Sequence, residues 1–397
     1  MKSKTLLLYV LGLCAAIVSL AQNLYVPLLP QLQHDLHTTF YMVNMTVSAF
    51  TIALAVLQIV LGPLIDRKGR RAVLLPGMAV YALASIGCAL SGSVEVLIGF
   101  RILQGIGAAA VPLAAATMIG DVFEGKERAK NMATYQMILG IAPALGPLIG
   151  GIIGSAAGYA GTFGFLSLTS ILMLITAVLV LPETKPASPA SGAKSFTLQS
   201  FLIVAKHKTG AAVLLTGFTL YYMFYNFIVF LPDILTANYQ LDAKQIGLTF
   251  LMLMSFSFVG SKISGKLQER MGTVKSLLIT CSAALSALVL FLLLAKLTLI
   301  GLLLSLAVVG FTAGLTMSVP PTLLSETFLQ ERATAIGLYN FIRYAGMATA
   351  PLIGSLLYQG GGIALLFGCT AALMLATLLF AKLKLGVRPG SPSGVTS

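Results

Sequence analysis

The chain has 397 residues, of which 57% are hydrophobic and only 9% are charged, and its mean hydropathy is +0.95. A soluble protein of this size needs a polar surface that 12 acidic and 25 basic residues cannot cover. The composition therefore excludes a soluble globular protein and also a disordered one, which would be polar. The net charge of +13 lies in short loops between long apolar runs rather than on one face of a folded domain. We therefore expect a lipid bilayer as partner and no nucleic acid.

Twelve apolar runs approach the length of about 20 residues that crosses a membrane. The first run follows Lys2 and Lys4 as in a signal peptide, but it continues past Ala21 to Leu29, which favours a spanning helix. We predict an all-α membrane protein with spans at 5–29, 43–65, 72–91, 95–119, 132–153, 163–181, 211–232, 245–264, 275–295, 299–321, 334–357 and 363–381.

The basic residues predict the orientation of these spans. With the N-terminus inside, 21 of the 25 bases fall on one side of the membrane, and only Lys244 and Lys296 fall on the other. The positive-inside rule then places both termini in the cytoplasm, and we expect a multi-pass protein of a bacterial cytoplasmic (inner, plasma) membrane. The predicted organisation is a six-helix half at 1–182, a cytoplasmic linker at 183–209, a second six-helix half at 210–386 and a disordered tail at 387–397.

The two halves match each other at a constant offset of 203 to 204 residues. Because six spans give both halves the same orientation, we predict a parallel repeat with a central site between the halves. The matching positions include Asn23 with Asn226, Asp66–Gly69 with Glu269–Gly272, Glu127–Ala129 with Glu331–Ala333, and Pro147–Gly150 with Pro351–Gly354.

The loop after the second span reads GPLIDRKGRR over Gly62–Arg71, and it resembles the loop signature G-x-L-x-D-R-x-G-R-R of the major facilitator superfamily. Glycine permits a tight turn, the acid can pair with a base or cap a helix, and the bases hold the loop in the cytoplasm. The resemblance implies twelve helices in two pseudo-symmetric halves, and it implies proton coupling or gating for Asp66 and Arg70.

The fourth span contains RILQGIGA over Arg101–Ala108, which resembles the family's signature for that span. An arginine buried in lipid is expensive and usually functional. In the family this arginine is associated with proton coupling, which the resemblance extends to Gln104 as its neighbour. A structural arginine that bonds a neighbouring helix is the alternative, and the sequence leaves it open.

The fifth span contains GIAPALGPLIGG over Gly140–Gly151, which resembles the family's antiporter signature G-x-x-x-G-P-x-x-G-G, with Ala144 and Leu145 filling the spacing. In the family this signature marks exporters rather than importers. The resemblance covers essentially the whole chain, points to twelve-span drug/proton antiporters, and implies the proton as coupling ion. Small residues four apart permit close helix packing, which we expect at Gly140, Gly146, Pro147 and Gly150.

The first span departs from the family pattern, because Asn23 stands where many drug/proton antiporters carry an aspartate. An amide has no proton to exchange at ordinary pH. All 12 acids fall in loops or near span ends. The proton carrier therefore stays open between Asp35, Glu95, Asp233 and the Asp66 network.

Arg343 lies about nine residues into the eleventh span, roughly 14 Å deep at about 1.5 Å per residue, and Leu139 occupies the matching position of the first half. An unpaired arginine at that depth should face a wet cavity or meet an anion. We therefore expect a positively charged centre that suits a carboxylate-bearing or zwitterionic substrate. The alternative is that Arg343 binds backbone carbonyls or an acid.

Tyr222, Tyr225 and Asn226 lie at i, i+3 and i+4 of the seventh span, so they share a helix face that would suit a ligand of mixed polarity. Aromatic residues at the lipid interface are the alternative. The residues predicted to bind substrate are Asn23, Tyr25, Gln136, Tyr222, Tyr225, Asn226, Asn340 and Arg343. The predicted cytoplasmic gate contacts are Asp121 with Arg128 and Glu326 with Arg332.

These features favour a secondary active exporter of small molecules: a multidrug-efflux-like proton antiporter that works by alternating access as a monomer. The alternative is a dedicated exporter of an anionic or zwitterionic metabolite such as a metallophore. The glycine- and proline-rich fifth span argues against an importer or uniporter. The chain has no HExxH motif, no nucleotide-binding loop and only three histidines, so we expect no enzyme, no cofactor and no metal site.

Overall fold

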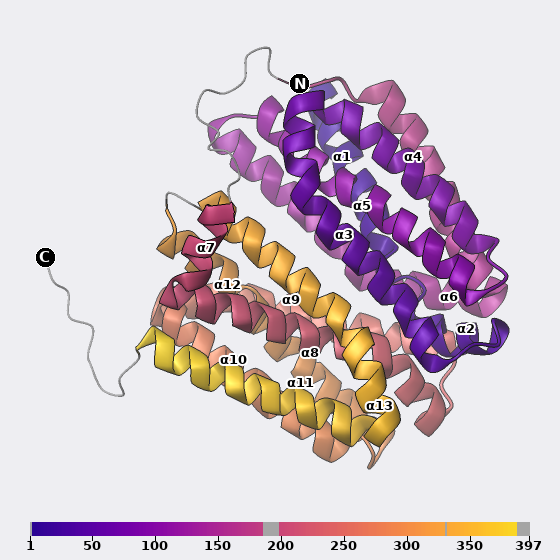
Figure 1. Ribbon diagram of the computed structural model, residues 1–397, viewed down its shortest axis with the longest axis vertical. Coiled ribbons are helices and arrows are strands. Elements are labelled where there is room, and N and C mark those ends of the chain that lie inside the picture. The colour runs from indigo at the N-terminus through magenta and orange to yellow at the C-terminus, as the bar shows by residue number, and fades with distance from the viewer. Residues whose placement is uncertain (1, 186–197, 330–331, 387–397) are drawn as a thin grey trace, which may run out of the picture. The chain divides into compact units, whose positions relative to one another are not determined.

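The structure is a computed structural model that describes residues 2–185, 198–329 and 332–386 (Figure 1). These residues form helices joined by short turns, and no strand occurs among them. The elements are α1 (Lys2–Leu20), η1 (Val26–Leu28), α2 (Leu29–Asp35), α3 (Phe40–Lys68), α4 (Arg70–Ala89), α5 (Val94–Val122), α6 (Gly125–Val180), α7 (Leu198–Lys206), α8 (Lys208–Tyr239), α9 (Ala243–Met271), α10 (Thr273–Leu294), α11 (Leu299–Met317), α12 (Val319–Thr327) and α13 (Arg332–Leu385).

The predicted spans appear in these helices. In the described part of the chain, nine helices are long and apolar enough to cross a membrane, and a shorter apolar helix covers Lys4–Leu20. Two of the nine hold two spans each: α6 turns at Gly158, where φ is +63°, and α13 turns at Gly361 and Gly362. A positive φ favours glycine, which explains why the chain can reverse at Gly158. The predicted all-α membrane fold is thus confirmed.

The first span is not one continuous helix, as the sequence had suggested. α1 ends at Leu20, the segment Ala21–Tyr25 forms turns, and the chain resumes helical structure as η1 and α2. Pro27 and Pro30 have no N–H and so cannot bond the carbonyls one turn earlier, which breaks the helix. In the second half Phe230 matches Pro27, and α8 continues through this region even though it contains Pro232.

The predicted linker contains more structure than its composition suggested. α7 lies within it, and α8 begins at Lys208, inside the range given to the linker. The sequence of α7, LQSFLIVAK, has apolar residues spaced for one face of a helix. Residues 186–197 of the linker and the tail at 387–397 lie outside the described residues.

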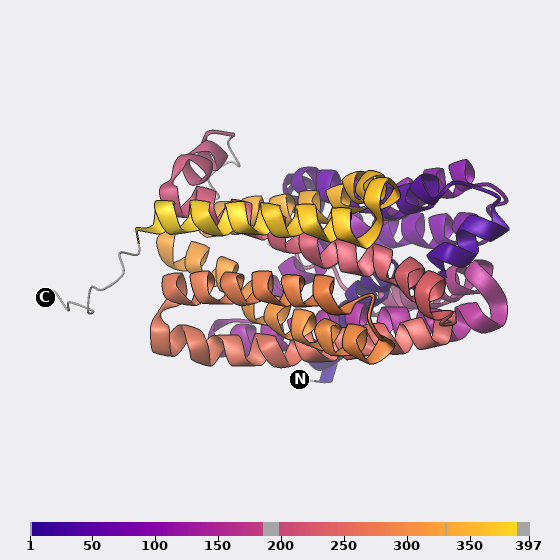
Figure 2. The same cartoon turned by 90° about the horizontal axis from the view of Figure 1, so that it is seen from below.

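Contacts divide the chain into two compact units. Unit 1 spans residues 1–194, 224–255 and 347–362, and unit 2 spans residues 195–223, 256–346 and 363–397. In unit 1, α5 packs against α3 and α4, and α1 packs against α6 (Figure 1). In unit 2, α10 lies beside α11 (Figure 2). Parts of α8, α9 and α13 from the second half belong to unit 1, so the units group contacts rather than sequence repeats.

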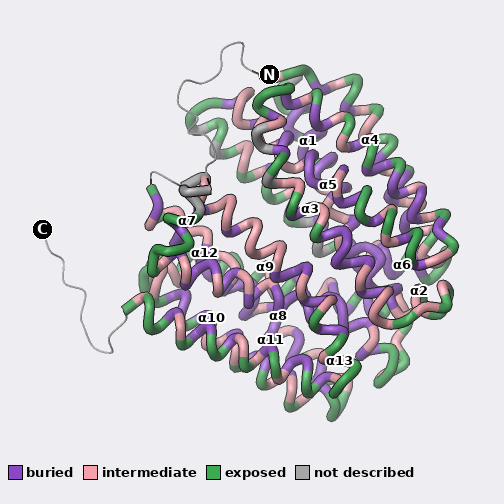
Figure 3. The backbone as a smooth tube through the Cα atoms, in the orientation of Figure 1, coloured by how far each residue is buried: buried purple, intermediate pink, exposed green. Residues whose placement is uncertain are grey.

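Buried and exposed residues occur along the same helices, as Figure 3 shows. On α5, Leu97, Arg101 and Gln104 are fully buried, whereas Ile102 and Leu103 are exposed. Large apolar residues that are exposed on spanning helices would be unfavourable in water and suit contact with lipid.

Candidate functional site

The break in the first span is held by Arg101, which reaches it from α5. Arg101 Nη1 donates to the carbonyl of Ala21 at 3.1 Å, and Nε donates to the carbonyl of Thr46 at 3.2 Å. The guanidinium also lies over the rings of Tyr25, at 4.7 Å, and Phe50, at 4.2 Å. Main-chain carbonyls that a broken helix leaves without partners must find donors inside the protein. Here the guanidinium of Arg101 is the donor. This geometry favours the structural interpretation of Arg101.

Gln104 extends the same buried network. Its Oε1 accepts from Arg101 Nη1 at 2.5 Å, and its Nε2 donates to Ser85 Oγ at 2.8 Å. On the other side of the guanidinium, the hydroxyls of Tyr25 and Thr46 share a hydrogen bond of 2.8 Å. These residues join α3, α4, α5 and the break into one packed layer. Tyr25, predicted to bind substrate, is fully buried in this layer.

The glycine-rich part of α6 packs against the break. A Cβ at Gly150 would overlap the carbonyl oxygen of Leu24, so α6 can approach this closely only with glycine there. A Cβ at Gly146 would make an ordinary contact of 3.6 Å, and a Cβ at Gly140 would meet nothing within 4 Å. Pro147 packs on its other side against α9, where a Cβ at Gly247 would come 2.7 Å from the Pro147 carbonyl. The four predicted packing residues thus differ greatly in how tightly they are held.

The predicted substrate-binding residues fall into separate groups. In unit 1, Tyr225 Oη donates to Asn23 Oδ1 at 3.3 Å, and both side chains are buried. Asn226 is fully buried against Gly354, the repeat counterpart of Gly150. Gln136 is exposed on α6.

The other predicted substrate-binding residues lie in unit 2. Tyr222 stacks on Phe218 with ring centroids 6.2 Å apart. Asn340 and Arg343 are partly exposed on α13. Arg343 Nη1 donates to Tyr221 Oη at 3.4 Å, and Nη2 donates to Tyr344 Oη at 3.5 Å. Neither contact is with a backbone carbonyl or an acid.

Within unit 1, helices from the first half meet helices from the second half along what we call the outer seam, at the ends predicted to face away from the cytoplasm. Asn44 Nδ2 on α3 donates to Ser355 Oγ on α13 at 3.0 Å, and Ser48 Oγ donates to the Ala348 carbonyl at 2.9 Å. α6 meets α9 through the glycine contact described above. The two sequence halves are therefore in contact at this end.

A polar and aromatic cluster forms the end of the outer seam. Tyr358 Oη on α13 donates to Asp233 Oδ2 on α8 at 2.8 Å. The Tyr358 ring lies 5.5 Å from Phe40 on α3 and 5.3 Å from Phe230 on α8. Asp233 thus connects two helices of the outer seam and is partly buried. The other candidate proton carriers, Asp35, Glu95 and Asp66, are exposed.

Removing the Tyr358 hydroxyl should open the outer seam more often. Tyr358→Phe keeps the ring but loses a hydrogen bond to a charged acceptor, worth about 1.5–3 kcal/mol, or roughly tenfold or more in an opening equilibrium. A Ser48→Cys reporter, fully buried in the closed seam, should then react about tenfold faster with a membrane-impermeant maleimide. The reporter chain should carry serine at the exposed Cys369.

The matched control is Tyr159→Phe. Tyr159 Oη donates to the Ser91 carbonyl at 2.7 Å, a bond that stays inside the first half. If Tyr358→Phe and Tyr159→Phe label at the same rate, the Tyr358 hydrogen bond does not hold the outer seam closed.

The loop signature forms a cluster at the end of unit 1 predicted to face the cytoplasm. Arg70 Nε pairs with Asp121 Oδ2 at 2.8 Å, and Arg70 Nη2 lies 3.5 Å from Asp66 Oδ1. Glu183, just after α6, accepts from the backbone N–H groups of Arg70 at 2.9 Å and Arg71 at 3.1 Å. The carboxylate thus caps the N-terminus of α4, where a negative charge is favourable.

One of the two predicted gate contacts needs correction. Asp121 pairs with Arg70, whereas the Arg128 guanidinium lies over Gly120, 2.9 Å from where a Cβ would stand. Arg128 follows the turn that starts α6, and this turn directs it back along α5 rather than to Asp121. The second predicted pair, Glu326 with Arg332, lies outside the description because the Arg332 side chain is not among the described ones.

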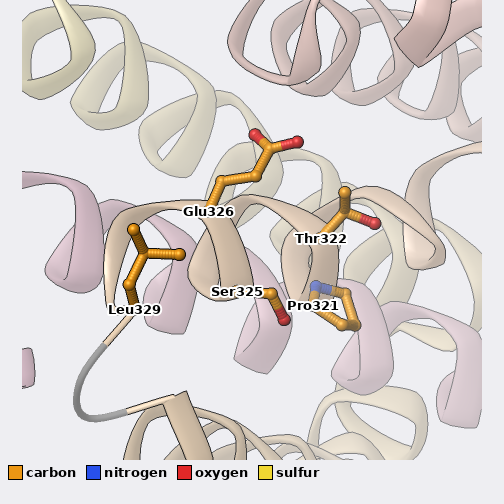
Figure 4. A pocket seen from close by; sticks show the side chains of 5 residues that line it. All are labelled: Pro321, Thr322, Ser325, Glu326 and Leu329. Carbon is orange, nitrogen blue, oxygen red and sulfur yellow. The ribbon is translucent and has the colours of Figure 1, made fainter. Parts of the chain in front are cut away.

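Unit 2 has a similar contact in which a hydroxyl takes the place of the arginine. Gly272 before α10 has a φ of +76°, as Gly69 before α4 has +111°, and Thr273 Oγ1 donates to Glu326 Oε2 at 2.7 Å. Thr273 and Glu326 thus hold the places of Arg70 and Asp121. Glu326 also borders an open pocket of about 480 Å³ on α12 and the turn after it (Figure 4), lined by Pro321, Thr322, Ser325, Glu326 and Leu329. This pocket contains none of the predicted substrate-binding residues.

Sequence reasoning missed Glu183, which no motif marks and which reaches α4 only through the fold. Burial alone would raise the pKa of its carboxyl, but backbone N–H groups of Arg70, Lys185, Ala72 and Thr184 lower the pKa below its ordinary value. A group with a lowered folded-state pKa stabilises the fold above its unfolded-state pKa, and this stabilisation is lost as the pH falls through the folded-state pKa.

Glu183→Gln should therefore lower the melting temperature at neutral pH, by about 1–3 °C. The difference from wild type should disappear as the pH falls below the ordinary glutamate pKa of 4.5. Thermal unfolding across pH measures both. Glu124→Gln is the control, since Glu124 precedes α6 without a side-chain cap hydrogen bond. A difference between wild type and Glu183→Gln that does not change with pH would contradict the capping role.

Comparisons with known proteins agree with this architecture. A family model described as Major Facilitator Superfamily matches residues 11–226 and 213–397. The chain is 26% identical over 362 residues, 89% of each chain, to YdgK of Bacillus subtilis (strain 168), an uncharacterized MFS-type transporter.

Two further relatives have names that state drug resistance. The chain is 35% identical over 170 residues, 43% of its length, to a chloramphenicol resistance protein of Pseudomonas aeruginosa. It is 29% identical over 172 residues, also 43% of its length, to the multidrug resistance protein MdtL of Shigella flexneri serotype 5b. These matches span less than half of the relatives' own length, 41% and 44%.

Solved structures share the fold. A bacterial homologue of the human lysosomal transporter Spinster, inward-facing and unoccupied, matches with a TM-score of 0.76 and 15% identity, over 97% of this chain and 96% of that one. The human organic anion transporter MFSD10 (TETRAN) matches with a TM-score of 0.68 and 19% identity, over 95% of this chain and 99% of that one. At these identities the likeness concerns the fold alone.

Proposed function

The chain belongs to the Major Facilitator Superfamily, and from that premise we propose that it is a proton-driven exporter of small drug-like molecules from the bacterial cytoplasm. It works by alternating access as a monomer, with both termini in the cytoplasm. Membership of this family makes it a multi-pass membrane transporter; the direction, the coupling ion and the substrates are the proposal.

The observation that carries export is the glycine–proline stretch in α6. It resembles the signature of exporters, and its Gly150 seats α6 against the break in the first span. Relatives named for chloramphenicol and multidrug resistance support the same direction and suggest drug-like substrates. The outer seam supports alternating access, because it joins the halves through a few hydrogen bonds and one aromatic cluster that can separate.

Asp233 is our candidate for the proton carrier. It is partly buried, it faces the Tyr358 hydroxyl, and it lies in the seam that must open to the outside. Protonation would replace a charge-assisted hydrogen bond by a weaker neutral one, so a proton from outside would favour opening. Asn23, which replaces the family's usual aspartate, cannot take this role.

Transport into proteoliposomes tests the proposal. With an acidic lumen, proton efflux should drive uptake of labelled chloramphenicol and of a lipophilic cation dye, and a protonophore should abolish it. Uptake that ignores the pH gradient would contradict antiport, and no uptake of either compound would contradict drug export.

Asp233→Asn tests the coupling residue in the same assay. This variant should lose gradient-driven accumulation but keep exchange of substrate at equal pH, whereas Glu95→Gln, an exposed acid at the start of α5, should behave as wild type. Normal accumulation by Asp233→Asn would exclude Asp233 as the carrier.

A further inference from the structure

Arg343 in unit 2 lacks the partners that a guanidinium inside a span normally has. Its two hydrogen bonds, to the hydroxyls of Tyr221 and Tyr344, are long at 3.4 and 3.5 Å, and its Nε is buried without a hydrogen-bond partner. The guanidinium also lies 5.4 Å from the Tyr221 ring and 4.9 Å from the Tyr344 ring. Among the described residues of unit 2, no acid lies within ion-pair distance of it.

Arg101 has more and closer hydrogen-bond partners than Arg343, although its Nη2 is also buried without a partner among the described residues. It donates to two backbone carbonyls and an amide oxygen at 2.5 to 3.2 Å, and it is fully buried. Arg343 is partly exposed, and among the described residues only phenol oxygens accept from it. A phenol that accepts from arginine still has its own O–H to donate. Arg343, Tyr221 and Tyr344 therefore present several donors and no negative charge.

A third tyrosine adds another donor. Tyr339 lies one turn before Arg343 on α13, and its buried hydroxyl has no hydrogen-bond partner in the part of the chain that the structure describes. In the first half, the matching Tyr135 donates to the Pro112 carbonyl at 2.9 Å. The repeat has thus kept the tyrosine, but in the second half its hydroxyl has no such acceptor.

The repeat shows that this cluster is not required by the fold. At the offset of 203 to 204 residues, Arg343 matches Leu139, Tyr344 matches Gly140 and Tyr221 matches Val18. The first half folds in the same way with none of these three polar side chains. A costly charge inside a span, carried at this position by only one half, is more easily explained by a ligand than by packing.

We propose that Arg343, together with Tyr221, Tyr339 and Tyr344, binds the carboxylate of an aromatic carboxylic acid. This inference rests on the proposed export function and adds an anionic class to its substrates. The guanidinium fork matches a carboxylate, and the phenols complete its hydrogen bonding. Phe218 and Tyr222, stacked at 6.2 Å on α8, offer ring faces for the aromatic body.

Two dyes that differ only at the carboxylate test this proposal. Dansylglycine is an anion at neutral pH, and dansylglycinamide is its neutral amide. We would measure their binding to the full chain in nanodiscs by dansyl fluorescence, with empty nanodiscs as the blank. The absence of tryptophan from the chain removes a competing fluorophore. Wild type should bind the anion at least about tenfold more tightly than the amide.

The variants separate a ligand site from a structural one. Arg343→Gln should bring the anion-to-amide ratio to near one while leaving amide binding within about twofold, which also reports that the variant is folded. Tyr221→Phe and Tyr344→Phe should each weaken anion binding several-fold, and they test the site even where Arg343→Gln does not fold. Arg343→Lys should restore only part of the preference, because an ammonium has no planar fork.

Several results would overturn the proposal. The proposal fails if the wild type does not bind dansylglycine or binds both dyes equally. It also fails if the Arg343→Gln and tyrosine variants still prefer dansylglycine to its amide. Proton-driven uptake of chloramphenicol decides the proposed function separately. If chloramphenicol is exported but no anion preference is found, the anion site fails alone.

Discussion

Gly150→Ala is expected to abolish transport and to lower stability clearly. The added methyl group would overlap the Leu24 carbonyl, which belongs to the backbone and cannot rotate away. α6 would have to move off the broken first span, and overpacking of this kind costs about 1–3 kcal/mol or more. We expect more than a tenfold loss of drug uptake in proteoliposomes and a lower melting temperature in detergent.

Two other glycines of the same pattern calibrate this result. Gly354→Ala meets the side chains of Phe230 and Asn226 at 2.6 and 2.8 Å, and side chains can adjust, so we expect an intermediate loss. Gly140→Ala meets nothing within 4 Å and replaces an exposed helical glycine, so it should be neutral or stabilise by about 0.5–1 kcal/mol. Wild-type uptake and melting by Gly150→Ala would show that close contact between α6 and the first span is not needed.

The same glycines show what a sequence can and cannot predict. Their spacing indicated close packing, since small residues four apart line one face of a helix. Spacing alone could not rank them, because the rank depends on which atoms of another helix stand opposite each one. The sequence does not predict the break in the first span opposite Gly150. The apolar run continues to Leu29, which favours one continuous helix despite Pro27 and Pro30.

For the two arginines in the spans, too, the sequence predicts one property and leaves another open. Apolar run length predicted twelve spans, and it therefore predicted that Arg101 and Arg343 lie inside them. Whether an arginine in a span is structural or free for a ligand depends on its hydrogen-bond partners, which come from other helices. The Arg101 partners Ala21 and Thr46 are far from it in sequence, and no pattern in the chain connects them. Likewise, no pattern in the sequence connects Arg343 with Tyr221, which lies 122 residues before it.

Contacts between charged groups at the helix ends were the least predictable. The sequence predicts a contact of Asp121 with Arg128, but the fold brings Arg70 to Asp121 instead. Glu183 caps α4 only because α6 returns to that end of unit 1. Long side chains at helix ends can reach several partners, so the partner is decided by how helices pack.

Arg101→Met is expected to be the most destabilising substitution at a charged residue in the spans. Methionine fills much of the same volume but donates nothing, so the carbonyls of Ala21 and Thr46 would lose their arginine hydrogen bonds. Each buried acceptor left unsatisfied costs about 1–3 kcal/mol, which predicts a total near 3–5 kcal/mol and a fall in melting temperature of roughly 5–10 °C. Thermal unfolding of the purified chain measures this directly.

Arg343→Met is the matched control, because the two arginines lie in spans and differ in their partners. Without Arg343, only the hydroxyls of Tyr221 and Tyr344 lose a hydrogen bond, and they can rotate to other partners. The melting temperature should therefore fall much less than in Arg101→Met. Arg101→Lys separates stability from proton coupling, since lysine keeps the charge but cannot reach both carbonyls as a fork does. If Arg101→Met unfolds like wild type yet loses only the pH-driven part of uptake, Arg101 acts in coupling. If it loses stability first, as we expect, Arg101 holds the broken span in place.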